Sequence, residues 1–153
     1  MEESGAGDVS GAAADHPLAR ARYVSLTTFR RTGAPVATPV WFAPSQDDPS
    51  LFAVITVDDT GKTKRLGHTQ RVELRACDVR GAVAVGSPTY VGTARVVRVA
   101  SGVASVRRAV VAKYGLPARL SDVLAKVARV AGIRRAPRAG ILVEVEPEPV
   151  TPE

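Results

Sequence analysis

The sequence predicts a mainly β protein, with six antiparallel strands in a Greek-key barrel and a helical pair before the last strand. Three observations support this fold class. Valine and alanine dominate the apolar residues and aromatic residues make up only 5%, and small and β-branched side chains suit a pleated sheet. Residues 71–77 alternate between apolar and charged side chains, as a half-buried strand does. Residues 103–131 instead place apolar residues at spacings of three and four, which predicts two amphipathic helices.

Each strand is expected where β-forming residues are bounded by turn residues. Gly33 can take a positive φ and allows a tight turn, so the first two strands are expected to form a hairpin. Short connections favour antiparallel pairing, and closure of the sheet leaves no long exposed edge. Ser87-Pro88 interrupts the run that leads into the fifth strand. The six expected strands span residues 23–28, 35–42, 51–57, 71–77, 89–99 and 141–145.

The length of 153 residues fits one domain with a single core. Residues 1–15 are expected to be a disordered acidic tail, residues 16–146 the folded domain, and residues 147–153 a second acidic tail. The start lacks the features of a secretory signal, and no apolar stretch approaches the roughly 20 residues that span a bilayer. Cys77 is the single cysteine, which fits a reducing compartment. A soluble cytoplasmic protein is therefore expected.

The formal net charge of +6 is unevenly distributed. Residues 1–15 and 144–153 each carry four acids and no lysine or arginine, so the body of the chain is strongly basic. Such a body is expected to attract an anion, and the candidates are nucleic acid, an anionic membrane or a phosphorylated small molecule. Genomic codon bias toward arginine and alanine is the alternative explanation for part of this charge.

The most informative segment, residues 56–65, follows the apolar third strand. Gly61 lets the backbone approach a ligand, and three cations follow within four residues. Charge-assisted hydrogen bonds to a phosphate are worth roughly 1.5–3 kcal/mol each. The alternative is a solvated basic turn. The residues expected to bind are Thr56, Thr60, Gly61, Lys62, Thr63, Lys64 and Arg65.

A phosphate-loop nucleoside triphosphatase (NTPase) is not favoured, although Gly61-Lys62-Thr63 resembles the end of the phosphate-loop motif. The motif requires a glycine five residues before Gly61, where Thr56 stands. The alternation of strands and helices typical of that fold is also missing.

A second candidate segment is Thr38-Pro39-Val40-Trp41-Phe42. Pro39 lacks a backbone donor and is therefore expected at an edge or bulge. Trp41 shares a face with Pro39, and its flat side chain could line a planar heterocycle. The alternative is a tryptophan packed in the core at one end of the barrel.

No side chain is identified as catalytic, and no metal site is expected. His16 and His68 lack a ligand spacing, and one cysteine cannot complete a zinc site. No serine lies in a nucleophile-elbow pattern, and Asp58-Asp59 is typical of a turn. If the protein is an enzyme, a cofactor is expected to carry the reactive chemistry.

Together these segments resemble the pyridoxamine-phosphate-oxidase-like split-barrel superfamily, and in particular its branch of deazaflavin (coenzyme F420)-dependent oxidoreductases. The resemblance covers roughly residues 20–146. It rests on residues 26–30 with Gly33, 38–42, 61–66, 71–78 with Gly81, 113–116 and 139–141.

The resemblance implies a six-stranded split barrel, commonly a homodimer with cofactor sites at the subunit interface. Lys62, Lys64 and Arg65 would hold the cofactor phosphate or anionic tail. The strand that carries Thr38, Pro39, Val40 and Trp41 would run beside the ring, with Thr56 near the ribityl chain. The implied reaction is hydride transfer between reduced F420 and a small organic acceptor of unknown identity.

Two alternatives stay open at this point. The first is an FMN-dependent oxidoreductase of the same fold, because both cofactors present a tricyclic ring and a phosphate. The second is a non-enzymatic cofactor carrier or basic binding protein. Residues 95–138 carry eleven lysines and arginines with Asp122 as their one acid. Only Tyr114 offers a stacking surface there, so nucleic acid is not favoured.

Overall fold

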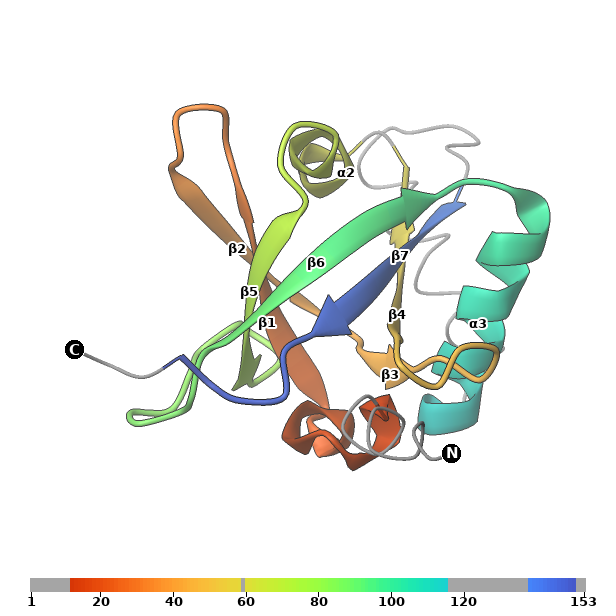
Figure 1. Ribbon diagram of the computed structural model, residues 1–153, viewed down its shortest axis with the longest axis horizontal. Helices are drawn as coiled ribbons and strands as arrows, with labels where there is room; N and C mark the ends of the chain where they lie inside the picture. The colour runs from red at the N-terminus through yellow and green to blue at the C-terminus, as the bar shows by residue number, and fades with distance from the viewer. Residues whose placement is uncertain (1–11, 59, 116–137, 151–153) are drawn as a thin grey trace, which may run out of the picture.

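The computed structural model describes residues 12–58, 60–115 and 138–150 (Figure 1). Within these ranges the strands form one seven-stranded sheet, in the order β2-β1-β5-β6-β7-β4-β3. All neighbouring strands are antiparallel, and the sheet is strongly curled. The elements are η1 (Ala13–Asp15), η2 (Pro17–Arg20), β1 (Tyr23–Phe29), β2 (Pro35–Val40), β3 (Ala43–Pro44), β4 (Phe52–Val57), α2 (Gly61–Leu66), β5 (Arg71–Cys77), β6 (Tyr90–Val97), α3 (Ala100–Tyr114) and β7 (Arg138–Val145).

The described chain therefore has seven strands, and the prediction of six was wrong. The predicted strand 35–42 ends at Val40, whose partner is Val24 on β1. After two further residues the chain pairs with β4, where Ala43 lies opposite Ala53. A single straight strand cannot pair with both β1 and β4, so the backbone bends at Trp41-Phe42. This bend joins the two edge strands of the sheet, β2 and β3, and the sheet must curl to allow it.

The expected helical pair is only partly visible. The first helix is α3, which starts three residues before the predicted periodic segment. The second predicted helix, around residues 120–131, lies outside the described residues. Residues 78–89 contain no helix or strand in the structure. The strand predicted at residues 89–99 corresponds to β6, which spans Tyr90–Val97.

The interior of the curled sheet holds the main core. Val72 and Leu74 alternate inward on β5 and are fully buried, as the sequence pattern predicts. The rings of Phe42 and Phe52 stack with centroids 4.3 Å apart. Other members include Val24, Leu26, Val54, Ile141 and Val143. This core fixes β1, whose two ends lie beside the two cationic clusters described below.

The helix α3 packs on the outer face of the sheet beside β3, β4 and β7 (Figure 1). Val106, Ala109 and Val110 are buried against Ala43 and Ala53. The helix lies very close to β7, since a Cβ on Gly140 would come within 2.6 Å of Val106 Cγ2. No helix in the described ranges is long and apolar enough to cross a membrane.

Candidate functional site: a cationic cluster around α2

The helix α2 is fixed at its start by a pair of threonines. The Thr60 backbone N–H donates to Thr63 Oγ1 at 3.0 Å, and the same hydroxyl donates to the Thr60 carbonyl at 2.9 Å. The Thr60 side chain in turn accepts from the Thr63 backbone N–H, which completes the capping box that satisfies backbone groups at a helix start. Thr63 and Leu66 are buried, so the helix is anchored to the core and directs its cations outward.

Arg65 folds back over the first turn of α2. Its Nε donates to Thr28 Oγ1 at 2.5 Å, and Thr28 is fully buried at the end of β1. Gly61 allows this arrangement, because a Cβ at that position would lie 2.6 Å from Arg65 Nη1. The guanidinium is therefore held in a defined place between β1 and α2.

Three cations influence one another here, and none of them forms an ion pair with a carboxylate within residues 12–58, 60–115 and 138–150. Burial lowers the pKa of the half-buried Lys62, and the charge of Arg65 lowers it further. Burial also lowers the pKa of Arg65, with a second contribution from Arg30. Asp58 lies just before the helix, but its carboxylate is bound by Arg98 at 2.6 Å. We call Arg30, Lys62 and Arg65 the α2 cluster. Its unbalanced positive charge favours an anion.

Two local features fit a phosphate group at the α2 cluster. Thr60 Oγ1 is buried and its hydroxyl proton has no acceptor among the described residues, and such unsatisfied donors are uncommon in native proteins. Gly61 leaves the space into which the Arg65 guanidinium folds. A tetrahedral oxyanion offers acceptors both for the Thr60 hydroxyl and for the Arg65 guanidinium.

Five other predicted residues lie in different surroundings. Lys64 is exposed on α2. Thr56 is buried in β4 opposite Ala139. Pro39 is exposed on the edge strand β2, where Gly81 lies against its ring. Val40, which follows Pro39, is buried. Thr38, which precedes Pro39, pairs with Leu26 on β1. Their roles as cofactor-binding residues stay predictions.

The structure does not bring Trp41 beside the α2 cluster within one chain. Trp41 follows Val40, which pairs with Val24 near the start of β1, whereas Arg65 binds Thr28 at the far end of the same strand. At about 3.3 Å per residue, Val24 and Thr28 lie about 13 Å apart along β1. The indole instead stacks on Tyr114, with ring centroids 4.7 Å apart and an interplanar angle of 16°.

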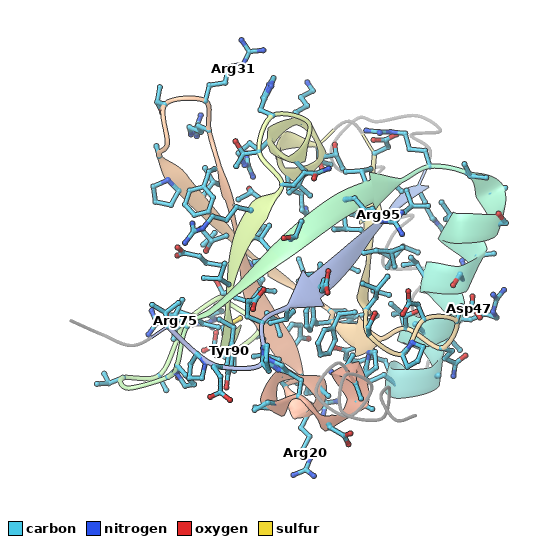
Figure 2. The ribbon with its side chains drawn as sticks, viewed as in Figure 1. Arg20, Arg31, Asp47, Arg75, Tyr90 and Arg95 are labelled. Atoms are coloured by element: carbon cyan, nitrogen blue, oxygen red, sulfur yellow. The ribbon has the colours of Figure 1, made fainter. Side chains whose placement is uncertain are left out.

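Sequence reasoning missed Thr28 and Arg30, which complete the α2 cluster from β1 and the turn after it. Their only signal was proximity to a turn containing two arginines, and nothing local connects that turn to residue 65. Figure 2 shows Arg31 at the tip of the β1–β2 hairpin, where its Nε lies 3.3 Å from His68 Nε2. The cationic surface therefore extends from α2 toward this hairpin.

The two histidines do not form a metal site. His16 Nδ1 accepts from the Leu18 backbone N–H at 3.1 Å, so Nε2 carries the proton and donates to the Glu146 carbonyl at 3.0 Å. His68 is exposed. Across the described residues, no three His, Cys, Asp or Glu side chains are grouped to hold a metal ion.

A strongly curled antiparallel sheet, with a cationic helix after β4, defines this chain as a small split-barrel protein with a cationic surface around α2. The sequence profile of the pyridoxamine 5'-phosphate oxidase family matches residues 11–147. The chain belongs to this family. The resemblance inferred from the sequence is thereby confirmed at the level of the superfamily.

Solved structures show the same fold at low sequence identity. A structure named F420 Reductase is 18% identical, covers 88% of this chain and 90% of its own, and has a TM-score of 0.53. An FAD-binding protein from Mesorhizobium loti is 16% identical over 84% of each chain, with a TM-score of 0.53. The heme storage protein HutZ from Vibrio cholerae is 16% identical over 84% and 83%, with a TM-score of 0.54. No curated protein matches the sequence.

Proposed function

We propose that this chain binds a phosphate-bearing deazaflavin, coenzyme F420, and uses it as an oxidoreductase acting on a small organic acceptor. The observation that carries the proposal is the α2 cluster, whose three cations lack a neighbouring carboxylate among the described residues. Membership of the pyridoxamine 5'-phosphate oxidase family supports a phosphorylated cofactor. The structural likeness to an F420 reductase supports the deazaflavin. FMN is the alternative cofactor.

Lys62 and Arg65 would hold the phosphate, with Thr60 Oγ1 as an additional hydrogen-bond partner. The unfavourable burial of the Lys62 ammonium would then be compensated by an opposite charge, so binding should raise its pKa toward the ordinary value. When bound, the deazaflavin supplies the hydride chemistry. The chain's own contribution is to bind and orient the cofactor through defined cations.

We also propose that the working unit is a homodimer. Within one chain, Trp41 and the α2 cluster lie at opposite ends of β1, so one chain does not place the tryptophan-bearing strand beside the phosphate site. A second copy could bring its own β2 residues, Thr38 to Trp41, next to the cluster. The assembly would function in the cytoplasm, and we expect neither nucleic acid nor membrane as a partner.

Heme binding, suggested by the likeness to a heme storage protein, is not supported by a specific residue. Both ring nitrogens of His16 are already hydrogen-bonded. The other histidine, His68, is exposed beside Arg31. The proposal therefore rests on a flavin-type cofactor.

The direct test is to titrate the purified protein with F420 and with FMN, followed by the fluorescence of each cofactor. Replacing both Lys62 and Lys64 by alanine should weaken binding by about tenfold to a hundredfold, since one charged hydrogen bond is worth about 1.5–3 kcal/mol. Arg108→Ala is the control, because this exposed arginine pairs with Asp47 on the far side of the sheet. Equal affinities for the double variant and the wild type would refute the site.

A further inference from the structure

A second group of cations lines a small cavity at the opposite end of β1. The cavity has a volume of about 230 Å³ and is lined by Arg20, Arg22, Lys113 and Tyr114. It lies where the segment between η2 and β1 meets the end of α3. Figure 2 shows Arg20 at one end of the molecule and Arg31 at the other. We call this the Lys113 pocket, to distinguish it from the α2 cluster.

Lys113 forms the inner part of the pocket. Its Nζ donates to the Ala21 carbonyl at 2.6 Å and to the Phe42 carbonyl at 2.5 Å. An ammonium group has three donors, so one remains. Among the residues that the structure describes, no carboxylate pairs with Lys113, Arg20 or Arg22. The pocket therefore combines three positive charges with at least one unused donor.

Tyr114 holds the rim of the pocket in place. Its hydroxyl accepts from the Phe42 backbone N–H at 3.0 Å and donates to the Arg22 carbonyl at 2.8 Å. Together with the bond from Lys113 to Ala21, this fixes the backbone on which the two arginines stand. Side chains that project from a fixed backbone lose less freedom when a ligand binds.

We propose that the Lys113 pocket binds the phosphoryl group of a small phosphorylated ligand, as a site separate from the α2 cluster. The volume of about 230 Å³ is several times the roughly 30 Å³ of a water molecule, so a tetrahedral oxyanion fits with some of its attached atoms. The two arginines that line the pocket and the Lys113 ammonium supply positive charge and N–H donors that complement a phosphoryl dianion.

The end of α3 does not cancel this preference. A helix C-terminus carries about half a negative charge, but the Gly115 N–H already binds the Val111 carbonyl there. Three full positive charges exceed that partial charge. Burial lowers the pKa of Lys113 to about 8, and an anion in the pocket would favour the charged ammonium form.

Trp41 provides the readout. It is the single tryptophan of the chain and stacks on Tyr114, which lines the pocket. Titration of the full-length protein with inorganic phosphate or with glycerol phosphate should give a saturable change in tryptophan fluorescence. Tighter binding of glycerol phosphate would identify an organic phosphate as the ligand, and tighter binding of inorganic phosphate would identify the free ion. Either result supports the site.

The variant that tests the pocket is Arg20→Gln combined with Arg22→Gln. Both side chains are exposed, so the fold should be retained, and phosphate binding should weaken at least tenfold. Arg108→Gln on α3 is the matched control, since this arginine lies outside the pocket. A fluorescence change that sodium chloride reproduces at equal ionic strength, or equal binding by the double variant and wild type, would overturn the proposal.

A pH series isolates Lys113. Sulfate stays a dianion throughout, and burial raises the pKa of Tyr114, so that its hydroxyl stays neutral. The charged fraction of Lys113 falls as pH rises through about 8, so sulfate binding should weaken several-fold between about pH 7 and 9. Lys113→Arg should remove most of that decline. A decline of equal size in this variant would contradict the role of Lys113.

These outcomes are independent of the proposed cofactor site. Titration of the Arg20/Arg22 double variant with F420 or FMN should match the wild type if the two sites are separate. Conversely, the Lys62/Lys64 double variant should bind sulfate normally in the Lys113 pocket. The experiments can therefore refute the Lys113 pocket without refuting the cofactor site at the α2 cluster, and the reverse.

Discussion

Replacing Tyr114 by phenylalanine tests how the bend between β2 and β3 is held. The Tyr114 hydroxyl joins three segments that are far apart in the sequence. It accepts from the Phe42 N–H at 3.0 Å and donates to the Arg22 carbonyl at 2.8 Å. Phenylalanine keeps the ring that stacks on Trp41, so the substitution removes the hydroxyl and little else.

The expected loss of stability can be estimated from the burial of the two partners. The Phe42 N–H is partly buried, and leaving such a donor unsatisfied costs about 1–3 kcal/mol. The Arg22 carbonyl lies in an exposed region, where water replaces the lost bond and the cost is about 0.5 kcal/mol. The total of about 2 kcal/mol corresponds to a fall in Tm of about 4–8 °C for a chain of this size.

Thermal and urea unfolding, followed by the fluorescence of Trp41, measure this loss. Tyr23→Phe is the matched control, because no hydrogen bond of the Tyr23 hydroxyl is seen within the described chain. It should leave the Tm nearly unchanged. A Tyr114→Phe variant as stable as this control would show that the hydroxyl does not fix the bend.

Two glycines give different predictions for stability. Gly92→Ala should destabilise the fold by about 1–3 kcal/mol in urea unfolding, because its Cβ would lie 2.7 Å from the Glu144 carbonyl oxygen of the neighbouring strand; unchanged unfolding would contradict this. Gly61→Ala should cost about 1 kcal/mol, since the flexible Arg65 side chain can move away from the added Cβ but its bond to the buried Thr28 hydroxyl is lost. It should break the contact with Thr28 and weaken cofactor binding about tenfold, and equal affinity would argue against a role for Arg65.

The strands that the sequence predicted best have periodic burial. On β5, Val72 and Leu74 face the core because alternation is a local property of a strand with one buried face. The strand 35–42 was predicted poorly for the opposite reason. Val40 and Phe42 are both buried, so the pattern of side chains continues while the backbone changes partner from β1 to β4. Only the pairing of distant strands reveals that bend.

The candidate site shows the same contrast between local features, which the sequence predicts, and contacts between distant segments, which it does not. Lys62, Gly61 and Arg65 are close in the sequence, and charge density alone pointed to them. Thr28, which positions Arg65, lies 37 residues away in the chain, and no spacing rule predicts such a contact. Tertiary pairing determines which of several nearby cations becomes fixed.

The bend at Trp41-Phe42 also explains why Lys113 and Tyr114 occur together, but it does not explain the positive charge of Lys113. Where strand pairing moves from β1 to β4, the backbone groups of Phe42 need partners. Tyr114 supplies an acceptor for the N–H and Lys113 a donor for the carbonyl. A neutral donor would satisfy that carbonyl equally well, without the cost that lowers the pKa of Lys113 to about 8. The bend thus requires a donor at this position but no charge, and the charge, with the two arginines beside it, is what the phosphoryl proposal explains.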